Sequence, residues 1–290
     1  MDAQRPVTIL TAQVRPVPYD PEGCLDKLER VVRVAVESFP RADLLAFPEY
    51  FVSAEDPFTG QAPPAYARRI AEPIPGPATE RLGKVAQRVG RYLMAGSMYE
   101  LDGQDLYNTA LAFSPDGDLV ARHRKVFPWR PWEEVARGEG FTTFDVPGKG
   151  RFGLMTCYEG WFPEVCRGLA LLGAEAILQP SATTTPDREE ELVLARANAI
   201  AHQCYVLNVN AATTVGGGRS IGVDPEGRIL FQGGSGEELI LEVIDLGRAA
   251  SVRERGTRGM NPVLREFREA PAGFLRTFSR LAGERDPEGG

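Results

Sequence analysis

The chain has 290 residues, 43% of them hydrophobic and 25% charged, which suits one large α/β domain or two small ones. Its net charge of −7 argues against a nucleic-acid-binding protein, because such proteins usually carry a basic face. No run of about 18 apolar residues is present to cross a membrane, and the first residues lack the pattern of a signal peptide. We therefore expect a cytoplasmic protein that binds neither nucleic acid nor membrane.

The first half of the chain alternates strand-like apolar runs with helical patterns. A β-branched run predicts a strand over Val7–Val14, and apolar residues at helical spacing predict a helix over Pro21–Phe39. A short buried strand is expected over Asp43–Glu49, and a helix over Pro77–Gly90 opens on proline and stops at glycine. Two further strands joined by a turn are predicted at Tyr92–Leu101 and Leu106–Ser114.

The second half continues this alternation. A strand is predicted over Phe152–Cys157, and a helix over Glu164–Leu172 is ended by Gly173. A helix over Asp187–His202 begins with acidic residues, which suit the positive end of the helix dipole. The remaining strands are predicted at Ala174–Pro180, Cys204–Ala211, Ser220–Val223, Arg228–Gln232 and Glu238–Ile244. Alternating strands and helices mixed with hairpins indicate a layered α/β fold with mixed sheets.

No linker long enough to divide the chain is visible, and no internal repeat is present. We therefore expect one domain over residues 1–248 and a C-terminal arm over residues 249–290. The segment after Arg248 reads as arginine-rich and irregular, and Asn261–Leu281 reads as partly helical. This arm is expected to pack on its own domain or on a partner subunit.

The cysteine and histidine content limits the possible chemistry. The four cysteines show neither a CxxC pair nor the spacing of a secreted disulfide framework, so we expect reduced thiols. Cys24, Cys166 and Cys204 are interpreted as small core residues. Because His123 and His202 are the only histidines and lie far apart, a histidine-rich zinc site is not expected. Both are interpreted as structural, so a cysteine enzyme would use a carboxylate as its base.

Reactive side chains follow three of the apolar runs. They are Glu49 in the stretch FPEY, Lys125 in HRKVFPW and Cys157 in LMTCYEG. Strand ends are the places where α/β folds assemble their sites. A carboxylate can take a thiol proton, a thiolate can attack a carbonyl or nitrile carbon, and an ammonium can stabilise the charge that develops on oxygen. The three residues together therefore predict a cysteine hydrolase.

At these residues the sequence resembles the nitrilase superfamily of carbon–nitrogen hydrolases, over Val7 to about Ile244. The family pattern is a Glu after a strand, a Lys in an (H/Y)RK segment, and a Cys that opens C-Y-(D/E)-x-x-(F/Y)-P-E. Glu49, Lys125 and Cys157 match it in the same order. The segment after the lysine is similar to the amidase branch. The resemblance implies a four-layer α-β-β-α sandwich, a homodimer or higher homo-oligomer, and neither a metal nor an organic cofactor.

The resemblance also implies a role for each matching residue. Cys157 would be the nucleophile, and Glu49 would be the general base and later the acid for the leaving group. Lys125 would stabilise the tetrahedral intermediate, with the backbone N–H of Tyr158 as second donor to the oxyanion. Glu133, which follows the lysine at the spacing of the amidase branch, would orient the substrate nitrogen or the lysine.

The residues after Cys157 bear on the substrate. Relatives that act on N-carbamoyl amino acids or omega-amides carry an arginine a few residues after the cysteine, where it can pair with a substrate carboxylate. Here the stretch Glu159–Phe162 offers no cation, and Glu159 would join the glutamates at positions 49 and 133 in making the site acidic. We therefore expect a small uncharged amide as the substrate. Candidate pocket residues, each of which could instead be packing or surface, are Tyr50, Trp129, Tyr158, Trp161 and Thr183.

Several functions stay open at this point. An N-carbamoyl amidohydrolase or a nitrilase would use the same three residues, although nitrilases proper read Cys-Trp-Glu where this chain reads Cys-Tyr-Glu. An acyltransferase or amide synthase would resolve the same thioester with an amine. A non-catalytic binding subunit belongs to a different class, and the intact set of three residues argues against it. The leading hypothesis is hydrolysis of a C–N bond, with release of ammonia or an amine.

Overall fold

The computed structural model describes residues 4–54, 65–213, 217–274 and 276, and it contains two six-stranded sheets. The first sheet has the spatial order β12 (Glu238–Asp245), β1 (Pro6–Gln13), β2 (Leu44–Ala46), β3 (Tyr92–Asp102), β4 (Asp105–Phe113) and β5 (Leu119–Arg124). The second has the order β11 (Ile229–Gln232), β10 (Ile221–Val223), β9 (Tyr205–Asn210), β8 (Ala176–Ser181), β7 (Gly150–Leu154) and β6 (Thr142–Val146).

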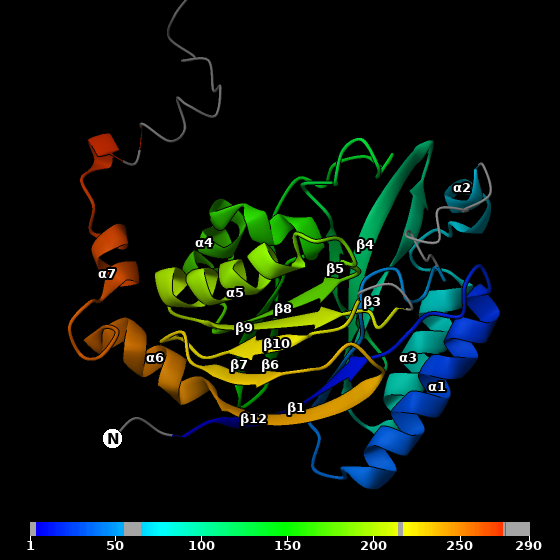
Figure 1. Cartoon of the computed structure of the whole chain (residues 1–290), viewed down its shortest axis with the longest axis horizontal. Helices are drawn as coiled ribbons and strands as arrows, with labels where there is room; N and C mark the ends of the chain where they lie inside the picture. The colour runs from blue at the N-terminus through cyan, green and yellow to red at the C-terminus, as the bar shows by residue number, and fades with distance from the viewer. Residues whose placement is uncertain (1–3, 55–64, 214–216, 275, 277–290) are drawn as a thin grey trace, which may run out of the picture.

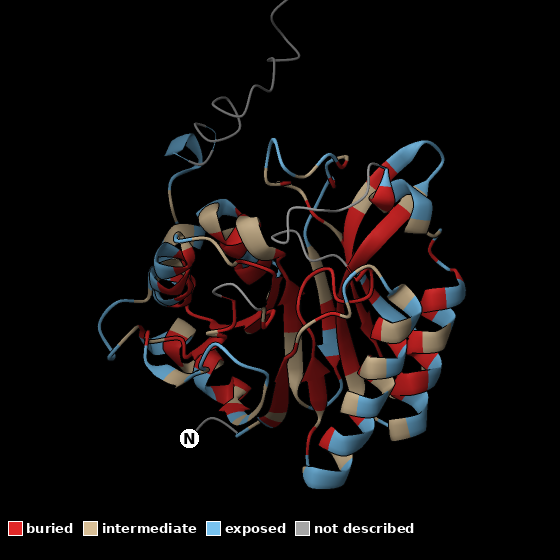
Figure 2. Cartoon of the chain, turned by 45° about the vertical axis from the view of Figure 1, so that its right-hand side comes forward, coloured by how far each residue is buried: buried red, intermediate tan, exposed pale blue. Residues whose placement is uncertain are grey.

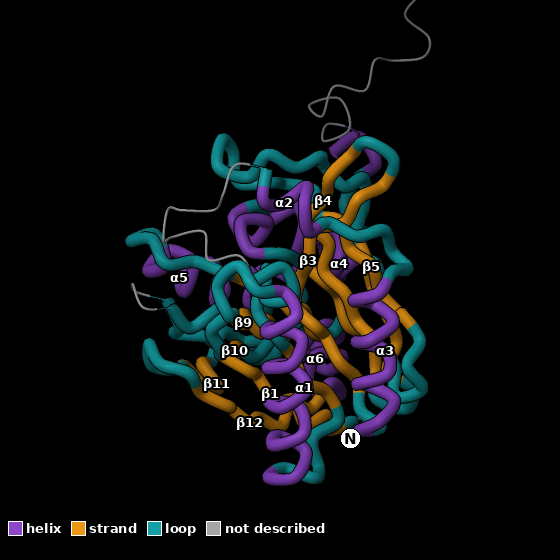
Figure 3. Tube along the Cα trace, turned by 90° about the vertical axis from the view of Figure 1, so that its right-hand side faces the viewer, coloured by secondary structure: helices purple, strands orange, loops and turns teal. Residues whose placement is uncertain are grey.

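A pair of helices covers the outer face of each sheet (Figure 1). Helices α1 (Pro21–Ser38) and α3 (Pro77–Val89) run side by side over the first sheet (Figure 3). Helices α4 (Pro163–Leu171) and α5 (Arg188–His202) cover the second. These four layers confirm the predicted α-β-β-α sandwich. Within the described residues, no helix is long and apolar enough to cross a membrane.

Three clusters of buried apolar side chains fill the three interfaces between the layers, as the red core in Figure 2 shows. Successive strand residues point to opposite faces of a sheet, so one strand supplies two clusters. In β1, Ile9 packs between the sheets and Leu10 packs under α1 and α3. In β8, Leu178 packs between the sheets and Ile177 packs under α4 and α5. Burial on both faces explains why apolar residues occupy adjacent positions in these strands, as in Ile9-Leu10 and Ile177-Leu178.

The central strands of the two sheets end close together. Strands β7, β8 and β9 are parallel neighbours in the second sheet, so their carboxyl ends share one edge. In the first sheet, β2 is parallel to both β1 and β3. The backbone N–H of Glu49, beyond β2, donates to the carbonyl of Ser181 at the end of β8 (3.3 Å). This hydrogen bond links the two sheets at the edge where the candidate residues lie.

Several predicted elements differ from the structure. The strand expected over Phe152–Cys157 ends at Leu154, and the cysteine instead begins the 3-10 helix η1 (Cys157–Trp161). The strand expected over Asp43–Glu49 covers only β2. The short helix α2 (Tyr66–Ile70) was not predicted.

The segment after Arg248, expected to be irregular, lies in helix α6 (Leu246–Arg255). Asp245 caps this helix by accepting a hydrogen bond from the Gly247 N–H, and the helix buries Ala249 and Val252. The arginines give this segment a polar composition, so its buried apolar positions were not recognised in the sequence. Of the expected helix at Asn261–Leu281, α7 covers Val263–Arg268, while residue 275 and residues 277–281 lie outside the described residues.

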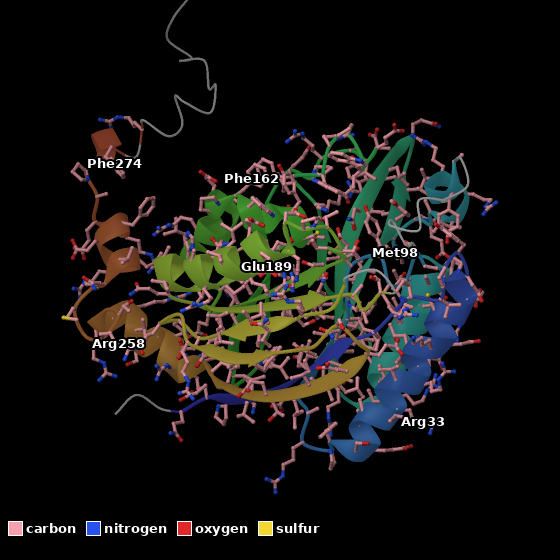
Figure 4. The ribbon with its side chains drawn as sticks, in the orientation of Figure 1. Arg33, Met98, Phe162, Glu189, Arg258 and Phe274 are labelled. Carbon is pink, nitrogen blue, oxygen red and sulfur yellow. The ribbon has the colours of Figure 1, made fainter. Side chains whose placement is uncertain are left out.

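The described part of the C-terminal arm packs on its own chain. The Gln203 side-chain amide donates to the carbonyls of Val252 (3.1 Å) and Asn261 (3.0 Å), and its oxygen accepts from the Leu264 N–H (3.0 Å). Arg258 and Phe274 mark the arm at the opposite end of the molecule from Arg33 on α1 (Figure 4). The polar side chain of Gln203 thus attaches the arm to the end of α5.

Candidate active site

The structure brings Glu49, Lys125 and Cys157 together between strand ends of both sheets. Lys125 directly follows β5, while Glu49 and Cys157 lie three residues beyond β2 and β7. The Lys125 Nζ lies 2.9 Å from Glu49 Oε1, and the Glu49 carboxylate and the Cys157 thiol lie close enough to shift each other's pKa. The three residues selected from the sequence therefore form one contiguous cluster.

The backbone at Cys157 bends sharply at the strand end. Its φ of 47° lies in the left-handed region that residues other than glycine rarely adopt, a kind of strain that is concentrated at functional sites. Gln179 Nε2 donates to the Cys157 carbonyl (2.9 Å) and holds the bend. A Cβ on Gly160 would lie 2.3 Å from that nitrogen, so a larger residue there would displace the Gln179 amide. Cys157 is partly exposed as a residue, while the other three cysteines are buried.

The segment that carries Glu49 approaches β3 very closely. Gly96 has a φ of 77°, and a Cβ at this position would lie 1.9 Å from the Pro48 carbonyl oxygen, so only glycine allows the approach. The Tyr50 N–H donates to the Ser97 hydroxyl (2.9 Å) and fixes the segment on the strand. The Glu49 carboxylate is thereby held 3% exposed at the site.

Glu133 provides a second carboxylate to the lysine. Its Oε2 lies 2.7 Å from Lys125 Nζ, and its Oε1 accepts from the Asn108 amide (3.0 Å). The Tyr50 hydroxyl and the Trp129 N–H also donate to it. Asn108 in addition donates to Glu49 Oε1 (2.8 Å), so one amide ties the two carboxylates together. The lysine is therefore fixed between two carboxylates.

Burial controls the charge state of this cluster. It raises the pKa of Glu49, against the effect of the Lys125 ammonium, and it raises the pKa of Cys157 well above the usual 9.0, an effect that the Glu49 carboxylate increases. Burial lowers the pKa of Lys125, but Glu133 and Glu49 outweigh it, so the pKa lies well above the usual 10.5. A neutral thiol thus faces a carboxylate with a raised pKa, which favours proton transfer between them. With two carboxylates and one ammonium, the formal charge is −1.

Among the candidate pocket residues, the side chains of Tyr50 and Thr183 contact the cluster. Tyr50 is buried, its ring packs 4.9 Å from that of Tyr99, and its hydroxyl reaches Glu133. Trp129 is partly exposed and stacks on Trp132 with a centroid separation of 4.4 Å. Thr183 is buried, and its hydroxyl lies 3.6 Å from the Cys157 sulfur. The two remaining candidates are Tyr158 and Trp161. Both are partly exposed, and their ring centroids lie 6.4 Å apart.

Glu159 does not add negative charge to an open site, as the sequence had suggested. Its carboxylate is fully buried and accepts from the backbone N–H groups of Thr156 and Val126, both at 2.6 Å, and from His123 Nε2 at 2.8 Å. His123 is buried and structural, as predicted. Thr156 precedes Cys157, and Val126 follows Lys125. By binding both neighbours, the Glu159 carboxylate fixes the separation of the Cys157 thiol and the Lys125 ammonium.

Replacing Glu159 with glutamine should lower both stability and turnover. An amide cannot accept from all three donors, and leaving a buried donor unpaired costs about 1–3 kcal/mol in the free energy of unfolding. The pKa of Glu159 is lowered, since His123 and the two backbone donors outweigh burial. The stabilisation is therefore present above the ordinary pKa of 4.5 and is lost as the pH falls further.

Thermal unfolding and kcat of Glu159→Gln, measured between about pH 4 and 8, test this expectation. The exposed Glu164→Gln is the matched control and should behave as wild type. A stability difference that grows toward low pH would contradict the assigned role.

A separate cleft of about 430 Å³ lies on the face of β5 opposite to the face that carries His123. Arg122 and Arg124 line it, whereas His123 points to the other face, and none of the three clustered residues takes part. The buried Glu100 carboxylate accepts hydrogen bonds from both arginines, and Asp102 pairs with Arg124. Because these charges balance one another, we assign this cleft no role.

A four-layer sandwich with a buried carboxylate, ammonium and thiol at its strand ends has the features of a carbon–nitrogen hydrolase. The family model described as carbon-nitrogen hydrolase matches residues 8–254, and the chain belongs to this family. Within it, the chain falls in the amidase-like branch of the nitrilase superfamily and is an amidase-type hydrolase of C–N bonds.

Similar proteins agree with this assignment. Omega-amidase NIT2 of Mus musculus is 33% identical over 249 residues, which cover 79% of this chain and 87% of the relative. Omega-amidase NIT2-A of Xenopus laevis is 34% identical with the same coverage. The crystal structure of Saccharomyces cerevisiae Nit3, a member of branch 10 of the nitrilase superfamily, has a TM-score of 0.78 at 29% identity, covering 87% of this chain and 94% of that one. An amidase from Nesterenkonia sp. shares the fold, with a TM-score of 0.72 at 24% identity, covering 96% and 98%.

Proposed function

We propose that this protein hydrolyses a small uncharged amide through a thioester on Cys157, with Glu49 as the proton carrier and Lys125 as the electrophile. The observation that carries this proposal is the shared Glu49 carboxylate. It accepts a hydrogen bond from the ammonium and lies beside the Cys157 thiol, in a buried setting that raises its pKa. This arrangement supports proton transfer and charge stabilisation at one point.

The reaction begins when the Cys157 sulfur attacks the amide carbon and its proton passes to Glu49. The charge that forms on the carbonyl oxygen is stabilised by Lys125 Nζ and by the N–H of Tyr158. This N–H lies in the first turn of η1, where helical N–H groups lack a partner within the helix. As the intermediate collapses, Glu49 protonates the departing nitrogen, and ammonia or an amine leaves. Glu49 then deprotonates a water molecule, which attacks the thioester and releases the acid and the thiol.

Glu133 acts on the lysine in this proposal. Its two oxygens already accept from Lys125, Asn108, Tyr50 and the Trp129 N–H. Few lone pairs are left to bind a substrate nitrogen. Of the two roles expected from the sequence, orientation of Lys125 therefore fits the contacts better.

The charges around the site favour a neutral substrate. Two arginines that could have neutralised a substrate carboxylate are held elsewhere. Arg130 donates to the carbonyls of Glu133 (2.9 Å) and Val135, and Arg196 donates to the Gly227 carbonyl (3.2 Å). Since the cluster already carries a formal charge of −1, a bound anion would meet like charge.

A screen of small amides, nitriles and N-carbamoyl compounds for ammonia release tests this function. We expect neutral amides to be the best substrates, and Glu49→Gln and Lys125→Met to lose this activity. Glu134→Gln, which alters an exposed carboxylate next to Glu133, is the matched control and should keep it. Preference for nitriles or N-carbamoyl compounds would overturn the substrate class. An amide product in the presence of added amine would indicate acyl transfer in place of hydrolysis.

We further propose a homodimer or higher oligomer, with the domain over residues 1–248 and the arm over residues 249–290 in each subunit. Apolar side chains on and beside α4 and α5 support association. Leu172, Val193 and Ile200 are 47%, 67% and 39% exposed in the single chain. Light scattering of the purified protein would give the assembly size.

A further inference from the structure

The mechanism above leaves one polar group at the nucleophile without a role. The Thr183 hydroxyl lies 3.6 Å from the Cys157 sulfur, and Thr183 is only 6% exposed. It follows β8, whose carboxyl end is adjacent to that of β7, which leads to the cysteine. Among the described residues, the sulfur is the one hydrogen-bond partner of this hydroxyl.

The position of Thr183 is fixed from the neighbouring strand. Its N–H donates to the Asn210 side chain (2.8 Å), whose amide nitrogen donates back to the Thr183 carbonyl (2.8 Å) and to the Gly218 carbonyl (2.8 Å). The Asn210 N–H in turn donates to the Ser220 hydroxyl (2.9 Å). A side chain on so constrained a backbone moves mainly by rotation about χ1, which is restricted in a β-branched residue.

The direction of the hydrogen bond follows from the proposed proton transfer. The Glu49 carboxylate lies beside the thiol and takes its proton in the mechanism above. Because the sulfur loses its proton, the Thr183 O–H donates the hydrogen bond and the sulfur accepts it.

We propose that Thr183 is a catalytic residue whose O–H donates to the Cys157 sulfur while that atom carries negative charge. The charge forms when the proton passes to Glu49 before attack, and again when the thioester C–S bond breaks. This inference rests on the proposed function, and it deepens it by adding a donor at the nucleophile. Hydrogen bonds to charged groups are stronger than neutral ones, so loss of the hydroxyl should slow both steps by about 10- to 100-fold.

Two substitutions separate this role from simple packing. Thr183→Val keeps the shape and removes the hydroxyl, and Thr183→Ser keeps the hydroxyl and removes a methyl group. Thr184→Val makes the same change at the adjacent, half-buried position and is the matched control. If Thr183→Val does not fold, Thr183→Ala against Thr183→Ser makes the same comparison.

The readouts are kcat and KM for a neutral amide and the pH dependence of Cys157 alkylation by iodoacetamide. We expect Thr183→Val to lower kcat and the alkylation rate by about 10- to 100-fold, with little change in KM and with alkylation shifted to higher pH. Thr183→Ser and Thr184→Val should stay close to wild type. Normal alkylation in Thr183→Val, or equal impairment in Thr183→Ser, would overturn the proposal. Residual turnover in Cys157→Ala would instead overturn the proposed function itself, so the two failures are distinguishable.

Discussion

Cys157→Ala is expected to lower amide turnover by at least ~10⁴-fold and to leave the fold intact, because it removes the proposed nucleophile. The thiol is small, so its removal should change the free energy of unfolding by less than about 1 kcal/mol. Steady-state kinetics and thermal unfolding monitored by circular dichroism measure the two effects.

The matched control for this variant is Cys24→Ala. Cys24 is buried in the core beneath the helices of the first sheet, far in sequence from the site. This substitution should cost some stability and leave kcat and KM essentially unchanged. More than a trace of turnover in Cys157→Ala would contradict the mechanism, and so would loss of turnover in a folded Cys24→Ala protein.

A neutral amide should be hydrolysed with a kcat/KM at least ~100-fold higher than an otherwise similar compound that carries a free carboxylate. The site has a formal charge of −1, and burial of an unpaired carboxylate beside Glu49 and Glu133 costs several kcal/mol. The stretch Glu159–Phe162, after Cys157, offers no cation. The comparison requires a pair of substrates that differ only in the carboxylate.

Trp161→Arg provides a sharper form of this comparison. It introduces a cation into that stretch, at a partly exposed position, and should raise kcat/KM for the carboxylate compound relative to the neutral amide. Equal or better use of the carboxylate compound by the wild type would refute the neutral-substrate prediction. The function would then be closer to that of the omega-amidases to which the chain is similar, or to a carbamoylase.

The alternating strands and helices and the three candidate residues were predictable from local patterns, whereas the four-layer arrangement came from the resemblance to the nitrilase superfamily. Adjacent apolar residues in strands such as β8 reflect burial on both faces, and the helical spacing in α1 reflects one buried face. Glu49 and Cys157 each follow a buried strand, Lys125 follows the polar edge strand β5, and the carboxyl ends of parallel neighbouring strands meet at one edge. These features can be read without knowledge of the neighbours in space.

The features that the sequence did not predict depend on contacts between distant segments. The left-handed backbone at Cys157 is held by Gln179, and neither residue shows this in its local pattern. Asn108 was one polar residue in a predicted strand, and its link between Glu49 and Glu133 exists only in the folded sheet. Glu159 was expected to add charge to the site. Its buried partner His123 lies 36 residues away in the sequence, so the pairing was not recognisable there.

Mass spectrometry of the protein trapped with a slowly hydrolysed amide tests the central claim most directly. The account predicts an acyl group on the peptide that contains Cys157, with a mass equal to the substrate less its amine. The adduct should be lost on incubation with water and be absent from Cys157→Ala. An acyl group on Cys24, Cys166 or Cys204, or turnover without any covalent adduct on a cysteine, would contradict it.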